Sequence, residues 1–163
     1  MGFLTNSEYF HRIFLILAKK RNVSDKYPEI EKKIVKTLKR EKSIIAAYVF
    51  GSFQNRTNTP LSDIDIAVLL SDGFKNSTHR IDFESQIENL LKERIAEYNF
   101  DVKTLNTAPL VIKGKIITNG KLLFTTSLKK VVDFEENTLI KYLDFKPEYD
   151  KLIDYQINSQ LNG

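Results

Sequence analysis

The spacing of Gly51-Ser52 and Asp63-Ile64-Asp65, with ten residues between them, constrains the fold of this chain more than any other feature. The Gly-Ser pair ends a nearly all-apolar run at residues 43–50, which is typical of a central strand covered on both faces. Asp63 and Asp65 begin a second such run, and side chains at i and i+2 of a strand project from one face. A turn without a Cβ can approach phosphate closely and donate N–H groups to it, and paired carboxylates can share Mg²⁺. The spacing therefore predicts a phosphate and metal site where one strand ends and the next begins.

The remaining apolar residues recur at helical or strand spacing. Gly120 is expected to end its helix in the left-handed conformation, and Pro147 is expected to break the chain ahead of a separate terminal helix. The pattern contains no internal repeat and predicts an α/β (α+β) fold, a mixed sheet flanked by helices. We expect helices over residues 5–17, 28–38, 83–95, 109–119 and 134–143, further strands over 99–105 and 121–126, a loop or short helix at 53–62 and a surface loop at 71–79.

The composition excludes several kinds of site. The 163 residues are 42% hydrophobic and 28% charged, which supports one compact domain with a real core. There is no cysteine for a disulfide or thiolate metal site, and the two histidines suggest neither a zinc cluster nor a Ser-His-Asp arrangement. The formal charge of +4 comes without interleaved arginines and aromatics, so no direct nucleic-acid binding is expected. No apolar segment is long enough to span a membrane, and we expect a cytoplasmic protein.

The two aspartates have two interpretations when taken alone. They fit a metal site, because carboxylates held side by side repel unless a cation lies between them, and they also fit a strand end that reaches solvent. Asp101 favours the metal site, since it lies on a separate predicted strand with Phe100 and Val102 facing the core. If that strand pairs beside residues 63–70, Asp101 joins Asp63 and Asp65 as a third metal ligand and as a general base.

With these motifs together, the chain resembles the nucleotidyltransferase superfamily typified by the DNA polymerase β palm. More narrowly, it is similar to the minimal nucleotidyltransferase (MNT) antitoxins over roughly residues 44–150. The resemblance rests on Gly51-Ser52, Asp63-Ile64-Asp65 and Asp101, on Leu105-Asn106 and Ala108-Pro109-Leu110, and on Tyr142-Leu143-Asp144-Phe145-Lys146-Pro147. One departure is that many relatives read Gly-Ser-x-Ala-Arg-Gly, where this chain has Gln54-Asn55-Arg56 in the last three positions.

The resemblance implies a function and a partner. Proteins of this kind transfer AMP from ATP, with Mg²⁺, to a tyrosine of a HEPN-domain ribonuclease toxin and so inactivate it. Carried over position by position, Gly51 and Ser52 hold the triphosphate. Asp63, Asp65 and Asp101 are the catalytic and metal-binding acids, with Asp101 also activating the tyrosine hydroxyl.

Two alternative functions stay open on the sequence alone. The chain could neutralise a toxin by binding without catalysis, or it could modify a small molecule in the manner of aminoglycoside nucleotidyltransferases. The expected organisation is an N-terminal helical extension at residues 1–25, a nucleotidyltransferase domain at 26–146 and a C-terminal amphipathic helix at 147–163.

Overall fold

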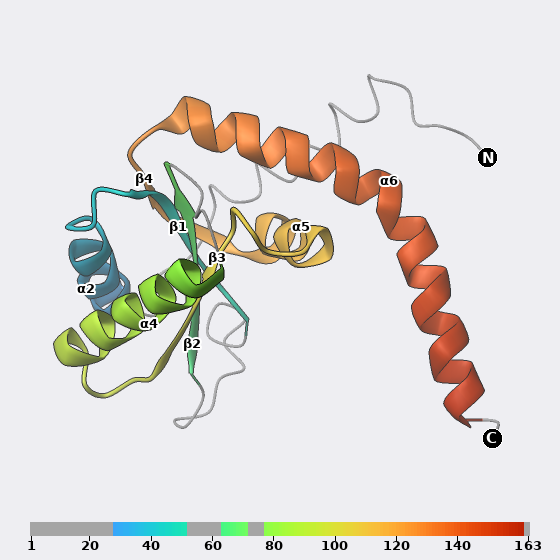
Figure 1. Cartoon of the computed structure of the whole chain (residues 1–163), viewed down its shortest axis with the longest axis horizontal. Helices are drawn as coiled ribbons and strands as arrows, with labels where there is room; N and C mark the ends of the chain where they lie inside the picture. The colour runs from blue at the N-terminus through green and yellow to red at the C-terminus, as the bar shows by residue number, and fades with distance from the viewer. Residues whose placement is uncertain (1–27, 52–62, 72–76, 162–163) are drawn as a thin grey trace.

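The computed structural model describes residues 28–51, 63–71 and 77–161. The helix expected at 5–17 and the segment at 53–62 lie outside these ranges. The described part contains a four-stranded sheet with helices on both faces (Figure 1).

The sheet is mixed, as the sequence predicts. Its strands are β1 (Ile44–Phe50), β2 (Ile64–Leu70), β3 (Phe100–Thr104) and β4 (Lys121–Thr125), in the order β3-β2-β1-β4. β1 runs antiparallel to both β2 and β4, whereas β2 and β3 are parallel. A parallel pair needs a crossover connection, and the chain between β2 and β3 contains helix α4 (Ser77–Arg94).

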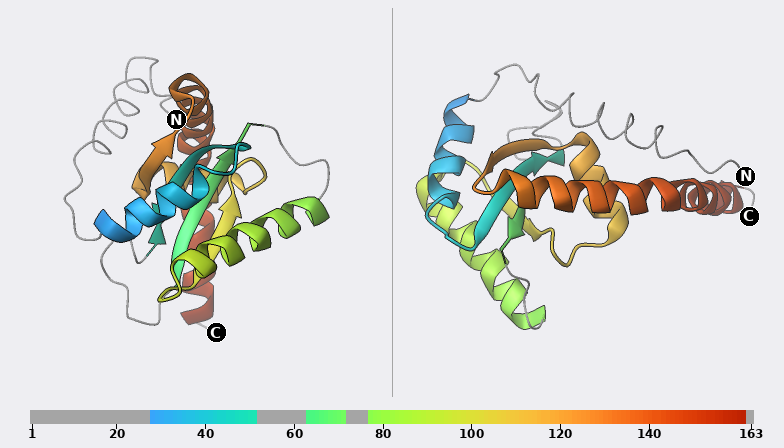
Figure 2. Two further views of the ribbon diagram at one scale, coloured as in Figure 1. Left: turned by 90° about the vertical axis from the view of Figure 1, so that its left-hand side faces the viewer. Right: turned by 90° about the horizontal axis from the view of Figure 1, so that it is seen from above.

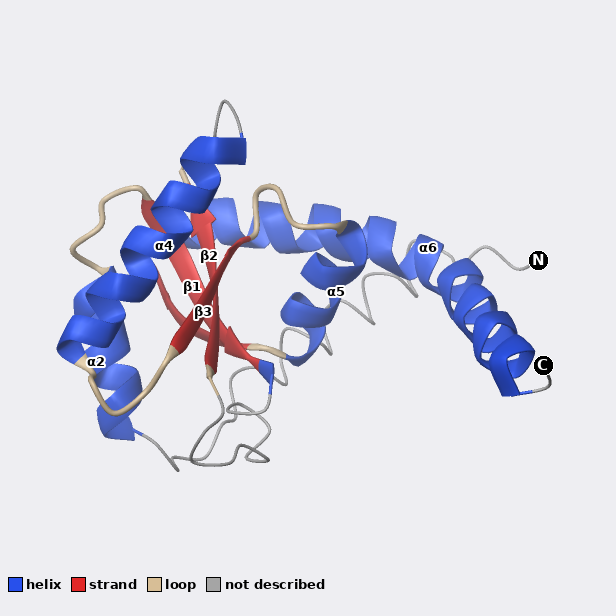
Figure 3. Ribbon diagram, turned by 60° about the horizontal axis from the view of Figure 1, so that its bottom comes forward, coloured by secondary structure: helices blue, strands red, loops and turns tan. Residues whose placement is uncertain are grey.

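Helices of different parts of the sequence cover the two faces of the sheet (Figure 3). Helix α2 (Pro28–Leu38) and α4 cover one face, and α5 (Leu110–Asn119) and α6 (Leu128–Leu161) cover the other. The alternation of β2 follows from this arrangement. Ile64, Ile66 and Val68 pack toward α2 and α4, while Ala67 and Leu69 pack toward α5 and α6.

Three local expectations are wrong in detail. Helix α4 begins at Ser77, six residues before the expected start, because its polar first turns carry no apolar stripe that would reveal them. Gly120 has φ −76° and is not left-handed. A Cβ there would lie 2.5 Å from the Ile116 carbonyl oxygen, so close backbone approach is the reason for glycine.

Pro147 does not break the chain. It lies inside α6, which continues to Leu161 and changes direction part-way along (Figure 1). A proline inside a helix removes one main-chain donor and bends the helix, but the other main-chain hydrogen bonds of the helix can continue past it. The N-terminal half of α6 is fixed to the sheet by Tyr48, whose buried hydroxyl donates to Oε1 of Glu135 at 3.0 Å.

The C-terminal half of α6 extends beyond α5 (Figure 2). Leu152, Tyr155 and Ile157 on this half are exposed. None of the described helices combines the length and the apolar character that a membrane crossing requires.

Candidate active site

Three of the residues predicted for the site lie together at one end of the sheet: Gly51, Asp65 and Asp101. Asp65 on β2 is the direct cross-strand neighbour of Phe50 on β1 and of Asp101 on β3. Residues in register on neighbouring strands project from the same face, so Asp65 and Asp101 lie side by side on the face covered by α5 and α6. The condition set by the sequence, that the strand of Asp101 pairs beside the strand of Asp65, is confirmed.

Gly51 directly follows β1 and has a left-handed φ of +69°. A Cβ at this position would lie 2.0 Å from Oδ2 of Asp65. Glycine is therefore required twice, because the backbone conformation disfavours a side chain and because the Asp65 carboxylate occupies the space. The contact explains physically why a glycine belongs at the end of the strand beside the acids. Ser52 and Arg56 lie outside the described residues.

The electrostatics of the site centre on Asp65, which is half-buried. Burial raises the pKa of its carboxyl, the negative charges of Asp101 and Asp63 raise that pKa further, and Lys103 lowers it. Both neighbouring acids are thus within electrostatic reach of Asp65. Asp63 itself lies just before β2 and is exposed.

Lys103 compensates part of this negative charge. Its Nζ lies 2.7 Å from Oδ1 of Asp101, and this hydrogen bond raises the pKa of the lysine. Lys103 and Asp101 project from the same face of β3, because they are two residues apart on the strand.

Two glutamates of α4 fix the strand that carries Asp101. Glu84 accepts a hydrogen bond from the Thr104 N–H at 2.8 Å, and Glu88 accepts one from the Val102 N–H at 2.9 Å. β3 is an edge strand, so these N–H groups have no neighbouring strand to bind. Arg80 donates to Glu84 at 2.8 Å and balances its charge.

Sequence reasoning missed Arg80, Glu84 and Glu88. Arg80 lies between the surface loop expected at residues 71–79 and the helix expected at 83–95, and Glu84 and Glu88 fall inside that helix with no role assigned to them. The available signal was the spacing of Arg80 and Glu84, which at i and i+4 is a helical ion pair.

The donor set fits Mg²⁺. No three histidine, cysteine or acidic side chains among the described residues form a group that could hold a metal ion by themselves. Mg²⁺ does not need such a cage, because one or two carboxylates suffice when substrate phosphates and water complete its octahedron. Asp65 with Asp101 beside it, and Asp63 two residues earlier on the chain, supply oxygen donors of that kind.

The combination of a mixed sheet, a left-handed glycine and acids on adjacent strands defines a class of protein, and sequence comparison agrees. The family model described as polymerase beta, nucleotidyltransferase matches residues 32–129, a range that includes Gly51, Asp63, Asp65 and Asp101. The chain therefore belongs to the polymerase-β-type nucleotidyltransferase family.

Within that family, the chain is similar to proteins of one particular kind. It is 30% identical over 125 residues to the protein adenylyltransferase MntA of Shewanella oneidensis, covering 76% of this chain and 85% of the relative. A crystal structure of a toxin–antitoxin with AMP-PNP contains a chain with a TM-score of 0.64 and 27% identity, covering 78% of this chain and 98% of that one. A structure of a tri-AMPylated Shewanella oneidensis HEPN toxin in complex with an MNT antitoxin matches with a TM-score of 0.60 and 26% identity over 78% of this chain and 96% of the other. These similarities confirm the resemblance to MNT antitoxins that the motifs indicated.

Proposed function

We propose that this chain is an antitoxin that transfers AMP from ATP to a tyrosine of a cognate HEPN-domain ribonuclease toxin and thereby inactivates it. The observation that carries the proposal is the pairing of Asp65 with Asp101 on adjacent strands, next to Gly51. The relatives support the acceptor class, since one is named a protein adenylyltransferase and another is an MNT antitoxin in complex with an AMPylated HEPN toxin.

Each acid has a separate role in the proposed reaction. Asp101 accepts the proton of the tyrosine hydroxyl as the phenolic oxygen forms a bond to the α-phosphorus of ATP. The bond between the α-phosphorus and the bridging oxygen breaks, and pyrophosphate leaves with the electron pair. Gly51 and Ser52 hold the triphosphate through N–H and hydroxyl donors.

Asp63 and Asp65, with Asp101, would hold Mg²⁺. When bound, Mg²⁺ neutralises the negative charge of the phosphates and of the departing pyrophosphate. Burial raises the pKa of Asp65, and the negative charges of Asp101 and Asp63 raise it further, so the three acids repel each other. Mutual repulsion of this kind favours binding of a cation.

The test uses the purified chain, the product of the adjacent gene, labelled ATP and Mg²⁺. We expect label on the partner protein, and we expect its loss with Asp63→Asn because a carboxylate charge is removed with little change in shape. Asp133→Asn is the matched control, since Asp133 is exposed on α6 far along the chain from the acids.

The alternatives predict different outcomes. If Asp63→Asn and Asp65→Asn still neutralised the toxin in cells at normal expression, the chain would be an antitoxin that acts by binding alone. Release of pyrophosphate only when an aminoglycoside is added, with no label on the neighbouring protein, would instead identify a small-molecule nucleotidyltransferase.

A further inference from the structure

A pocket of about 430 Å³ opens beside the edge strand β3, between α4 and the beginning of α5. Its volume is within the range of small-ligand sites. Its lining includes Phe50, Arg80, Asp101, Lys103, Pro109 and Ile112.

The pocket adjoins only one of the three proposed acids. Asp101 belongs to its lining, whereas Asp63 and Asp65 are not among the described residues that line it. In the proposed reaction Asp101 is the acid that faces the attacking hydroxyl, and Gly51 and Asp65 face the triphosphate. The pocket thus lies on the acceptor side of the reacting phosphorus.

The walls of the pocket suit a flat aromatic group. Phe50, Pro109 and Ile112 provide apolar surface for the faces of a ring. The cationic side chains of Lys103 and Arg80 lie at the same pocket, and cations interact favourably with an aromatic face.

We propose that this pocket receives the ring of the acceptor tyrosine and so selects an aromatic hydroxyl over serine or threonine. The inference rests on the proposed function and assigns its acceptor subsite. The ion pair of Lys103 uses Oδ1 of Asp101, and the tyrosine hydroxyl is bound by the other oxygen of the same carboxylate.

The experiment compares two isoleucines of similar exposure. Ile112 lines the pocket and is 40% exposed, whereas Ile140 on α6 is 44% exposed and lies outside the pocket lining. Each is changed to glutamate in the full chain, and both variants are checked for unchanged thermal unfolding. Initial rates of AMP transfer are then measured against the concentration of the toxin encoded by the adjacent gene, at saturating ATP. Affinity for ATP is measured separately with a fluorescent non-hydrolysable analogue.

We expect Ile112→Glu to raise the KM for the toxin about tenfold or more, because a carboxylate replaces an apolar wall next to Asp101. Affinity for the ATP analogue should change less than about twofold, because the substitution weakens binding of the acceptor and leaves the residues that bind the nucleotide unchanged. Ile140→Glu should change neither quantity. In a second arm, replacing the acceptor tyrosine of the toxin by serine should lower transfer at that position at least about tenfold.

Several results would overturn the acceptor assignment: an unchanged KM with Ile112→Glu, an equal rise with Ile140→Glu, a parallel loss of nucleotide affinity, or efficient transfer to serine. Failure of the proposed function is distinguishable from all of these. In that case the unsubstituted chain transfers no label to the toxin, and the assignment of the pocket falls with the proposed function.

Discussion

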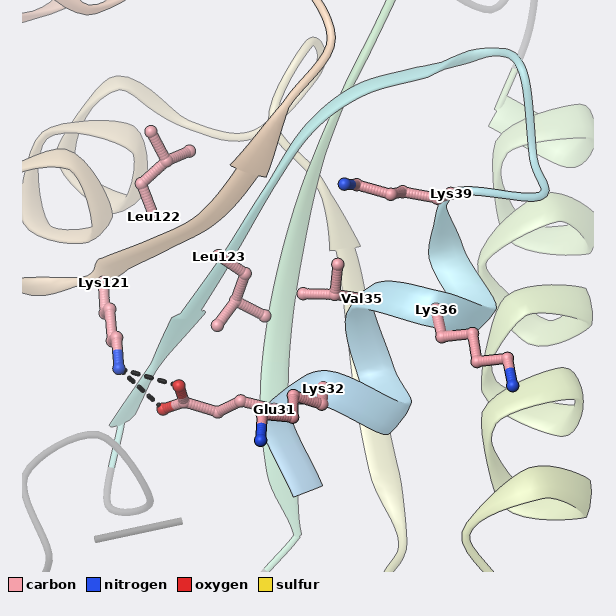
Figure 4. A pocket seen from close by; sticks show the side chains of 8 residues that line it. All are labelled: Glu31, Lys32, Val35, Lys36, Lys39, Lys121, Leu122 and Leu123. Carbon is pink, nitrogen blue, oxygen red and sulfur yellow. Dashed lines mark hydrogen bonds and ion pairs between the residues drawn. The ribbon is translucent and has the colours of Figure 1, made fainter. Parts of the chain in front are cut away.

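The two edges of the sheet are built in opposite ways. At the β3 edge, acidic side chains of α4 bind the main chain of the strand, with Glu84 and Glu88 accepting N–H groups at 2.8 and 2.9 Å. At the β4 edge, Lys121 reaches across to Glu31 of α2 at 2.7 and 3.0 Å (Figure 4). Lysines dominate the groove around that pair, which is lined by Glu31, Lys32, Val35, Lys36, Lys39, Lys121, Leu122 and Leu123.

The difference lies in what the charged side chains bind at each edge, the backbone of a strand or another side chain. Glu84 is only 7% exposed and binds the backbone on which Asp101 lies. The side chains of Lys121 and Glu31 are 18% and 21% exposed and join two side chains, with no backbone group held between them. The β3 edge therefore holds Asp101, the proposed base, in position, while the β4 edge joins a helix to a strand.

The largest expected difference between the edges is in catalysis. Asp101→Asn removes the proposed base, and we expect the rate of AMP transfer to fall about 10²- to 10⁴-fold. Glu31→Gln at the other edge should leave the rate within about twofold. Single-turnover transfer of labelled AMP measures both variants. Equal losses would show that catalysis is not confined to the β3 side of the sheet.

The edges should also differ in their contribution to stability. Glu84→Leu leaves the Thr104 N–H and Arg80 without their acceptor, and we expect the free energy of unfolding to fall by about 2 kcal/mol. Glu31→Leu breaks a partly exposed ion pair and should cost no more than about 1 kcal/mol. Urea unfolding of both variants gives the comparison. A larger loss with Glu31→Leu would reverse the assignment of the fixed edge.

Much of this arrangement could be predicted from the sequence, because the central strands are strongly patterned. The run at residues 43–50 and the change from alternating to fully apolar residues after Asp65 identify β1 and β2 to within one residue of their observed bounds. The alternation of Phe100, Asp101 and Val102 in the same way predicts β3. Local periodicity carries this information, so it is readable without the fold.

The features that the sequence did not reveal depend on contacts between distant segments. The glutamates that cap β3 look like surface residues until α4 is placed against an edge strand. Pro147 reads as a break, yet tertiary context allows the helix around it to continue. Gly120 is explained by its approach to the Ile116 carbonyl oxygen and not by its own conformation.

A substitution that removes charge should change Tm in opposite directions at Asp65, on β2 beside the β3 edge, and at Glu31, which pairs with Lys121 of the β4 edge. The folded-state pKa of Asp65 is raised, so ionised Asp65 destabilises the fold at neutral pH, and this cost disappears as the pH falls toward the ordinary aspartate value of about 3.9. Asp65→Asn should therefore raise Tm slightly at pH 7, by an amount that shrinks on acidification. Glu31→Gln should lower Tm at pH 7, because it removes an attraction.

Mg²⁺ provides a second readout of the same contrast. It should raise the Tm of the unsubstituted chain and of Glu31→Gln, and raise that of Asp65→Asn less, since the substitution removes a proposed ligand. Asp65→Asn and Glu31→Gln are each expected to change the free energy of unfolding by about 1 kcal/mol or less. A lower Tm for Asp65→Asn at pH 7 would contradict the repulsion between the acids.

The smallest expected effect concerns Lys103. Its ion pair with Asp101 is 49% and 40% exposed, so Lys103→Gln should change the free energy of unfolding by no more than about 0.5 kcal/mol. Because Lys103 lowers the pKa of Asp65, its removal raises that pKa further, and the acidic limb of the pH–rate profile should move to higher pH if ionised Asp65 is required. Lys36→Gln in the β4 groove is the matched control and should leave the profile unchanged. A profile that moves with Lys36→Gln as much as with Lys103→Gln would mean that the net charge of the chain, and not a lysine beside the acids, sets the ionisation of the site.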